Sequence, residues 1–167
     1  MSLELGKKCL LQKNFKDAEK IFLDLSKNNN TFEINYNLGV INFELRNIKK
    51  SLQFFEKCKK IDPKSSNTYL KIAYLEQSIG DIEKSLSTYL KVLDINARDI
   101  RAYYGIFSLN PNFLKSNHFE VIKQINDNPS VNILEKFLSK FLLSKKEKNH
   151  KNFDKELAFL NNSHNLC

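Results

Sequence analysis

Few residues of this chain have the types and spacing that catalysis or metal binding requires. The sequence has no glycine-rich phosphate loop, no Gly-x-Ser-x-Gly elbow and no His-Glu-x-x-His motif. It also has no Cys-x-x-Cys pair, which structural zinc sites and redox proteins use. The histidines and cysteines have no ligand spacing: His118, His150, His164, Cys9, Cys58 and Cys167. We therefore predict that the chain is not an enzyme and that it has no metal and no cofactor.

The acidic residues have a simpler explanation than catalysis. Asp17 with Glu19, and Asp81 with Glu83, fall in or near the first turns of predicted helices. A carboxylate at that place interacts favourably with the positive end of the helix dipole. These pairs need no catalytic role.

The bulk composition is that of a soluble globular domain. The chain has 167 residues, with 41% hydrophobic and 28% charged residues and a formal net charge of +8. Because the lysines are spread along predicted helices, we interpret the charge as solvated surface. No apolar stretch approaches the roughly 20 residues that span a bilayer, and the first residues lack a secretory signal core. We expect a cytoplasmic protein without membrane insertion.

One phrase of the sequence occurs twice, 34 positions apart. The corresponding landmarks are Gly39 and Ala73, Ser51 and Ser85, Phe55 and Tyr89, and Pro63 and Ala97. A fixed period of this size predicts a stack of helical hairpins, in which each unit buries its apolar face against the next. The small residues are expected where paired helices approach closely, because a large side chain would push the helices apart.

The spacing resembles that of the tetratricopeptide repeat family. Leu38-Gly39, Phe55 and Pro63 match the family pattern, and Ser51 stands at its small-residue position. Two departures are polar, because Asn35 and Asn42 replace an expected Trp and Tyr. The resemblance implies an all-α fold: an α-solenoid of antiparallel helix pairs, coiled as a right-handed superhelix of about ten helices.

Following the landmarks along the chain predicts one repeat domain of five units. A shorter unit precedes the doubled phrase, and the pattern decays after Asp99 before partly recovering. In the last unit Glu156 occupies the small-residue position. The predicted repeats are 1–31, 32–65, 66–99, a degenerate 100–136 and a divergent 137–167.

The resemblance also implies a concave groove, lined by the first helix of each pair. Position by position, the predicted groove residues are Lys7, Glu33, Tyr36, Asn37, Val40, Phe43, Asn67, Leu70, Lys71, Tyr74, Gln77, Arg101 and Tyr104, with Leu10 and Leu11 from the first unit. Aromatic anchors beside amide and basic donors suit an extended peptide. The alternative is that these rings simply pack between neighbouring helices. Our leading hypothesis is a non-catalytic scaffold that binds a peptide or protein segment in this groove.

One specialised groove of the family holds a C-terminal carboxylate with Lys, Asn and Arg side chains. Asn37 and Lys71 fit this pattern. Leu3, Lys7 and Asn67 do not. The sequence therefore does not favour that ligand.

Three other hypotheses concern the C-terminal end. The last thirty residues resemble the repeat arm of bacterial tetratricopeptide-sulfotransferase proteins, which implies a recruitment arm of a larger enzyme. The basic segment 136–155 could bind an anionic ligand or nucleic acid, although such a run is more typical of a solvated helical hairpin and we expect no nucleic acid partner. Self-association is the third, because apolar residues of the last helix lack a polar cap: Phe153, Phe159 and Leu166.

Overall fold

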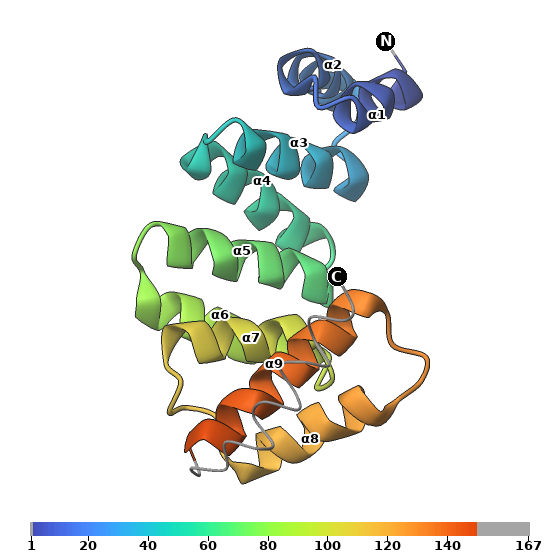
Figure 1. Ribbon diagram of the computed structural model, residues 1–167. Helices are drawn as coiled ribbons and strands as arrows, with labels where there is room; N and C mark the ends of the chain where they lie inside the picture. The colour runs from blue at the N-terminus through green and yellow to red at the C-terminus, as the bar shows by residue number, and fades with distance from the viewer. Residues whose placement is uncertain (1, 150–167) are drawn as a thin grey trace. The chain divides into compact units, whose positions relative to one another are not determined.

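The computed structural model describes residues 2–149, and these residues form nine α-helices and no strand (Figure 1). The chain divides into two compact units, residues 1–81 and 82–167, and each is described by itself. The first contains α1 (Leu3–Leu11), α2 (Phe15–Asn28), α3 (Phe32–Glu44), α4 (Ile48–Ile61) and α5 (Ser66–Ser78). The second contains α6 (Ile82–Ile95), α7 (Ile100–Leu109), α8 (Ser116–Asp127) and α9 (Ile133–Asn149).

In the first unit, α1, α3 and α5 each end in the same type of turn. Lys13, Arg46 and Gly80 have left-handed φ angles of 58°, 61° and 83°. After α3, the N–H of Arg46 donates to the Phe43 carbonyl (3.0 Å) and that of Asn47 to the Asn42 carbonyl (2.8 Å). These two bonds define a Schellman motif, which satisfies the last carbonyls of a helix and reverses the chain. Each of these helices therefore stops at the same point of its repeat.

The α3–α4 hairpin is closed by small residues, as the sequence predicted. A Cβ atom on Gly39 would lie 2.8 Å from Cζ of Phe55, so the Phe55 ring rests directly on the α3 backbone. The Ser51 hydroxyl donates to the Gly39 carbonyl (2.7 Å) and is fully buried. Gly6 of α1 approaches the Phe22 ring of α2 in the same way. The core of the unit continues through apolar residues such as Leu38, Ile41 and Ile72.

The two polar departures from the family pattern are both buried. Asn42 donates from its side-chain amide to the Leu38 carbonyl (3.0 Å). Asn35 donates to the Thr31 carbonyl and to Oδ1 of Asn30, both at 2.7 Å. The hydrogen bonds to backbone and to Asn30 compensate for part of the loss of water around these amides.

The second unit keeps the period but loses the hairpin. α7 ends at Leu109, because Pro111 follows at once, and residues 110–115 contain no left-handed turn. Phe107 and Phe119 stand two periods after Gly39 and Ser51, where the first hairpin has small residues. α8 makes little contact with α7, and α9 packs against both (Figure 1). Two phenylalanines at positions of close approach explain why α7 and α8 do not pair.

Some sequence predictions fall outside the described residues. The tenth helix, the uncapped C-terminal apolar residues and most of the repeat 137–167 belong to residues 150–167. α9 runs without interruption across the predicted boundary between residues 136 and 137. Within residues 2–149, no helix is long and apolar enough to cross a membrane.

Candidate functional site

The first helices of the repeats in the first unit carry all of the predicted groove residues except Arg101 and Tyr104. We call their shared surface the α1–α3–α5 face; it comprises Lys7, Glu33, Tyr36, Asn37, Val40, Phe43, Asn67, Leu70, Lys71, Tyr74 and Gln77. Side-chain contacts join its helices, because Lys7 of α1 pairs with Glu33 of α3 (2.6 Å) and Phe43 of α3 meets Tyr74 of α5 (5.5 Å between ring centroids). The structure thus brings these residues together within one unit.

A depression of about 580 Å³ lies between α1 and α3. Its walls are mostly apolar and come from Leu10, Leu11, Phe32 and Tyr36, with Lys7, Glu33 and Asn37 at the rim. Leu11 is 86% exposed, so an apolar side chain faces solvent here. Phe32 was not among the predicted groove residues, although its spacing of four residues before Tyr36 places the two rings on one side of a helix.

The aromatic residues of the face divide into structural and exposed ones. Tyr36 stacks on Phe32 (5.8 Å between centroids) and meets Phe55 of α4 edge to face (5.4 Å). Together with Val40 and Phe43 it packs against the buried cluster around Phe55. Tyr74 is 51% exposed and touches Phe43 by its edge. Packing between helices therefore accounts for Tyr36 and Phe43, whereas about half of the Tyr74 side chain stays exposed.

The polar side chains of the face differ in their exposure and in the hydrogen bonds and ion pairs that they make. Asn37 donates one amide hydrogen to the Glu33 carbonyl (2.9 Å), which leaves its other amide hydrogen and its oxygen for further bonds. Asn67 and Lys71 are exposed, and Leu70 and Gln77 are half-buried. Lys71 makes no ion pair with any residue of the described chain. On the α1–α3–α5 face the paired cation is Lys7, and its hydrogen bond to Glu33 raises the pKa of Lys7.

The remaining two groove residues belong to the second unit. Arg101 holds Asp99 with two side-chain hydrogen bonds, from Nε (2.9 Å) and from a terminal nitrogen (2.7 Å). Asp99 is buried and also accepts the backbone N–H of Arg101, so it caps the start of α7. Tyr104 meets Phe141 of α9 edge to face, with ring centroids 5.8 Å apart. In this unit, α9 packs against the α7 side chain that the sequence assigned to a groove.

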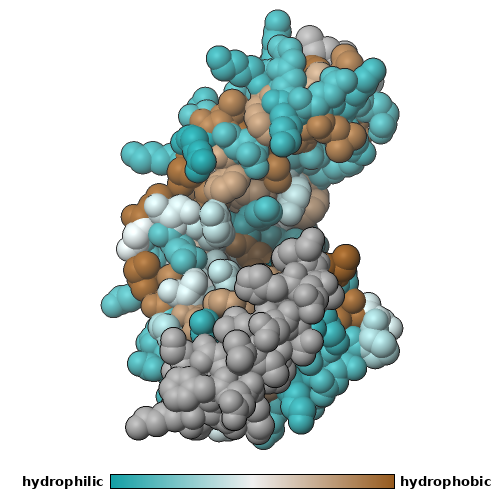
Figure 2. Space-filling view, viewed as in Figure 1, coloured by the Kyte–Doolittle hydropathy of each residue, from teal (hydrophilic) through white to brown (hydrophobic). Residues whose placement is uncertain are grey.

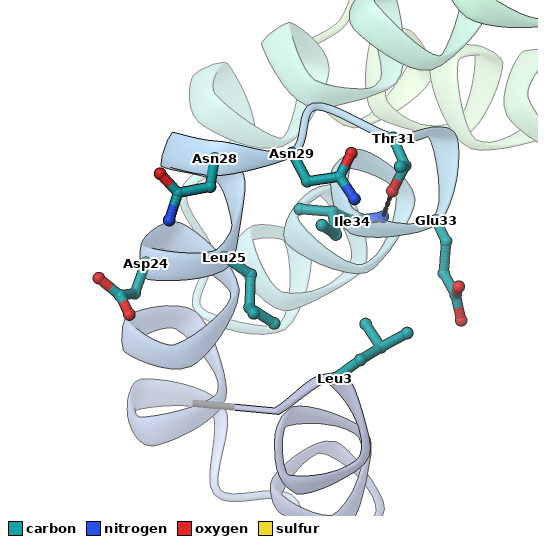
Figure 3. A pocket seen from close by; sticks show the side chains of 8 residues that line it. All are labelled: Leu3, Asp24, Leu25, Asn28, Asn29, Thr31, Glu33 and Ile34. Carbon is teal, nitrogen blue, oxygen red and sulfur yellow. Dashed lines mark hydrogen bonds between the residues drawn. The ribbon is translucent and has the colours of Figure 1, made fainter.

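A second cavity, of about 350 Å³, lies where α2 connects to α3 (Figure 3). Its lining combines amides, two carboxylates and apolar residues: Leu3, Asp24, Leu25, Asn28, Asn29, Thr31, Glu33 and Ile34. Both carboxylates are already paired, Asp24 with Lys27 (3.2 Å) and Glu33 with Lys7. Thr31 caps α3 by accepting the N–H of Ile34 (3.3 Å). These contacts support the connection between the helices rather than a ligand.

The basic segment at the C-terminal end is described only in part. Lys145 lies over the Phe141 ring and Lys146 over the Phe119 ring, at 5.2 and 5.4 Å from the centroids. Such cation–π contacts attach lysine stems to the surface of α8 and α9. Lys151 and Lys155 lie outside the described residues.

Two of the groups with shifted pKa values that lie away from the α1–α3–α5 face are Cys58 and His118. Burial raises the pKa of the Cys58 thiol to about 12, which keeps it a protonated, unreactive core residue. Burial, and then the nearby Lys115, lowers the pKa of His118. Among residues 2–149, no group of three or more His, Cys, Asp or Glu side chains is arranged to hold a metal ion.

Comparison with known families identifies the repeats. The tetratricopeptide repeat model matches residues 32–65 and 66–99. These two segments are tetratricopeptide repeats. No curated protein sequence matches it significantly.

Solved structures of tetratricopeptide repeat proteins share the fold. The crystal structure of MamA superposes with a TM-score of 0.71 at 13% identity, covering 99% of this chain and 96% of that one. TTC0263, a thermophilic protein from Thermus thermophilus, gives 0.65 at 15% identity, with 99% and 89% covered. YrrB, described as having an unusual peptide-binding site, gives 0.65 at 10% identity, with 98% and 84% covered. At these identities the likeness shows the fold, which is the all-α tetratricopeptide solenoid.

Proposed function

We propose that this tetratricopeptide scaffold binds an extended peptide segment of a protein partner on the α1–α3–α5 face. The observation that carries the proposal is the combination of an exposed ring, Tyr74, with an apolar depression at Leu11. Figure 2 shows hydrophobic (brown) and hydrophilic (teal) residues side by side over the helices of the first unit. A surface that mixes apolar anchors with amide donors is suited to hold a peptide backbone and its side chains.

Two features of the face support a peptide rather than a small molecule. The depression is open, and an exposed ring, Tyr74 of α5, lies on the same face beyond it. Within residues 2–149, Asn37 keeps one amide hydrogen and its oxygen for further bonds, and these match the C=O and N–H of an extended backbone. YrrB, which has an unusual peptide-binding site, provides a precedent for peptide binding on this fold.

The test is a selection of peptides on the full chain. A displayed library of random 12-residue peptides is selected for binding, and affinities of the recovered peptides are measured by fluorescence anisotropy. The double variant Asn37→Ala, Tyr74→Ala removes the amide and the exposed ring. We expect it to weaken binding by at least about tenfold, since truncated interface anchors commonly cost more than 1 kcal/mol.

A matched control changes two exposed residues on another helix. Lys49 and Gln53 lie on α4, and both are exposed. The variant Lys49→Ala, Gln53→Ala should bind the selected peptides as the unchanged chain does. If no selected peptide loses affinity with the Asn37, Tyr74 variant while its helical content is intact, the face is not the binding surface.

A further inference from the structure

The depression between α1 and α3 discriminates by charge. Lys7 and Glu33 at its rim neutralise one another at 2.6 Å, and its walls are the apolar side chains of Leu10, Leu11 and Phe32. A charged group placed there would lose water without gaining a counter-ion. An uncharged side chain would instead bury apolar surface, which is favourable by roughly 25 cal/mol per Å². The depression therefore suits an aliphatic or aromatic side chain.

Lys71 places a cation on the same face, at a fixed distance from the depression between α1 and α3. It follows Asn37 by one 34-residue period, so it occupies the same turn of the next first helix. It is exposed and has no acidic partner within residues 2–149. An exposed charge of this kind adds modest affinity but selects partners of opposite sign.

The helix spacing sets the separation between the two features. Side chains of α1, α3 and α5 touch in succession, and we take the usual spacing of about 10 Å between the axes of helices whose side chains meet. From the middle of the depression to Lys71 is one and a half such steps, or about 15 Å. An extended chain rises about 3.3 Å per residue, so this distance corresponds to about five residues.

On this basis we propose the chemistry of the partner: an extended segment with an uncharged apolar side chain seated in the α1–α3 depression and, about five residues away, an Asp or Glu paired with Lys71. This inference rests on the proposed function, since it names the partner of the same face. It adds the order of groups along the peptide, which the proposed function leaves open.

The peptides selected from the random library test it directly. We expect them to share an apolar residue and an acidic residue about five positions apart. The variant Leu11→Glu should lower their affinity by about tenfold, because it places a carboxylate where an apolar side chain would be buried. The control Leu23→Glu changes an exposed leucine of α2 and should leave the affinity unchanged.

A charge exchange tests the second feature. Lys71→Glu should lower the affinity by about threefold, within the range measured for exposed ion pairs. A peptide in which the acidic residue is replaced by Lys should bind Lys71→Glu better than it binds the unchanged chain. Recovery of affinity when the Lys-containing peptide meets Lys71→Glu would show that residue 71 and the acidic residue of the original peptide form the ion pair.

The outcomes separate this inference from the proposed function. Peptides that need Asn37 and Tyr74 but tolerate Leu11→Glu and Lys71→Glu overturn the inference and leave the binding face standing. The absence of any peptide dependent on Asn37 and Tyr74 overturns both. A chain that is dimeric in light scattering and becomes monomeric with Leu11→Glu, without an effect on peptides, assigns the depression to a second copy and also overturns the inference.

Discussion

The α3–α4 hairpin and the α7–α8 pair use the same 34-residue register, yet they pack differently. In the first, Gly39 and Ser51 let the helices touch, and the Arg46 turn closes the hairpin. In the second, Phe107 and Phe119 stand at the two small positions, and α9 packs against both helices. The comparison teaches that the period places the helices, whereas residue size at two positions decides which helices pair.

The two halves of the predicted groove also differ, because one is exposed and the other is packed. In the first unit, Tyr74 is half exposed and Lys71 has no acidic partner in the described chain. In the second, Phe141 of α9 covers part of Tyr104, and Asp99 engages Arg101. We therefore expect the first unit to use its first helices for binding and the second to use them for packing.

The largest expected effect on stability comes from placing in α3, at Gly39, the phenylalanine that α7 has at the corresponding position 107. Gly39→Phe places a ring where even a Cβ atom would lie 2.8 Å from the Phe55 ring. Overpacking of this kind should lower the free energy of unfolding by about 3 kcal/mol. Urea denaturation followed by circular dichroism measures it. As a control, Glu44→Phe adds the same ring at an exposed position of α3 and should change stability by less than about 0.5 kcal/mol.

Two basic residues of the predicted groove, Arg101 and Lys71, should respond differently to removal. Arg101→Ala leaves the carboxylate of Asp99 buried without its partner, so we expect a loss of about 1.5 kcal/mol in unfolding free energy. Lys71→Ala removes an exposed side chain and should cost less than about 0.5 kcal/mol. Thermal or urea unfolding of both variants measures the contrast. Equal losses would show that Lys71 also has a structural role.

Much of this contrast could be predicted from the sequence, and part of it could not. Gly39, Ser51 and the turn before α4 follow from the period, and so do the bounds of the helix pair. Phe107 and Phe119 were also visible at the two small positions, but their consequence depends on which helix fills the space that they create. The pairing of Arg101 with Asp99 was hidden because the sequence assigned Arg101 by position alone. Phe32 was missed because the family pattern gives that position no role.

Substitutions at the turn residues Arg46 and Gly80 should change stability by smaller amounts and in opposite directions. Arg46 adopts φ 61°, which costs a residue with a side chain about 1 kcal/mol relative to glycine. Arg46→Gly should therefore stabilise the chain by about 0.5 kcal/mol after the extra freedom of glycine in the unfolded state is included. The reciprocal control, Gly80→Ala at φ 83°, meets no neighbouring atom and should destabilise by about 1 kcal/mol through backbone strain alone. Unfolding curves that move in the same direction for both variants would contradict this explanation.

The smallest effect is a pH dependence located in the second unit. His118 accepts the backbone N–H of Lys115 through Nδ1 (3.0 Å) and stacks on Phe113, so the folded state favours the neutral ring. Burial and Lys115 lower the pKa of His118 below its usual value of 6.5. Its contribution is fully present above about pH 6.5 and is lost as the pH falls from there through the lower pKa of the folded state, because the unfolded chain binds the extra proton first. The unfolding free energy should therefore decrease as the pH is lowered below about 6.5.

The variant His118→Gln isolates this contribution. Other groups titrate in both proteins, so the difference between the two pH profiles reports His118. We expect the unfolding free energy of the unchanged chain minus that of the variant to decrease as the pH is lowered. An increase would contradict the neutral ring that accepts the Lys115 N–H.

The central claim is that the α1–α3–α5 face binds peptides while the corresponding α7 surface serves packing. The most direct measurement compares Tyr74→Ala with Tyr104→Ala, two half-exposed tyrosines at 51% and 41%, in their affinity for the same selected peptides. We predict a loss of about tenfold or more for Tyr74→Ala and a change of less than about twofold for Tyr104→Ala. An equal or larger loss for Tyr104→Ala, with the fold of both variants intact, would contradict the claim.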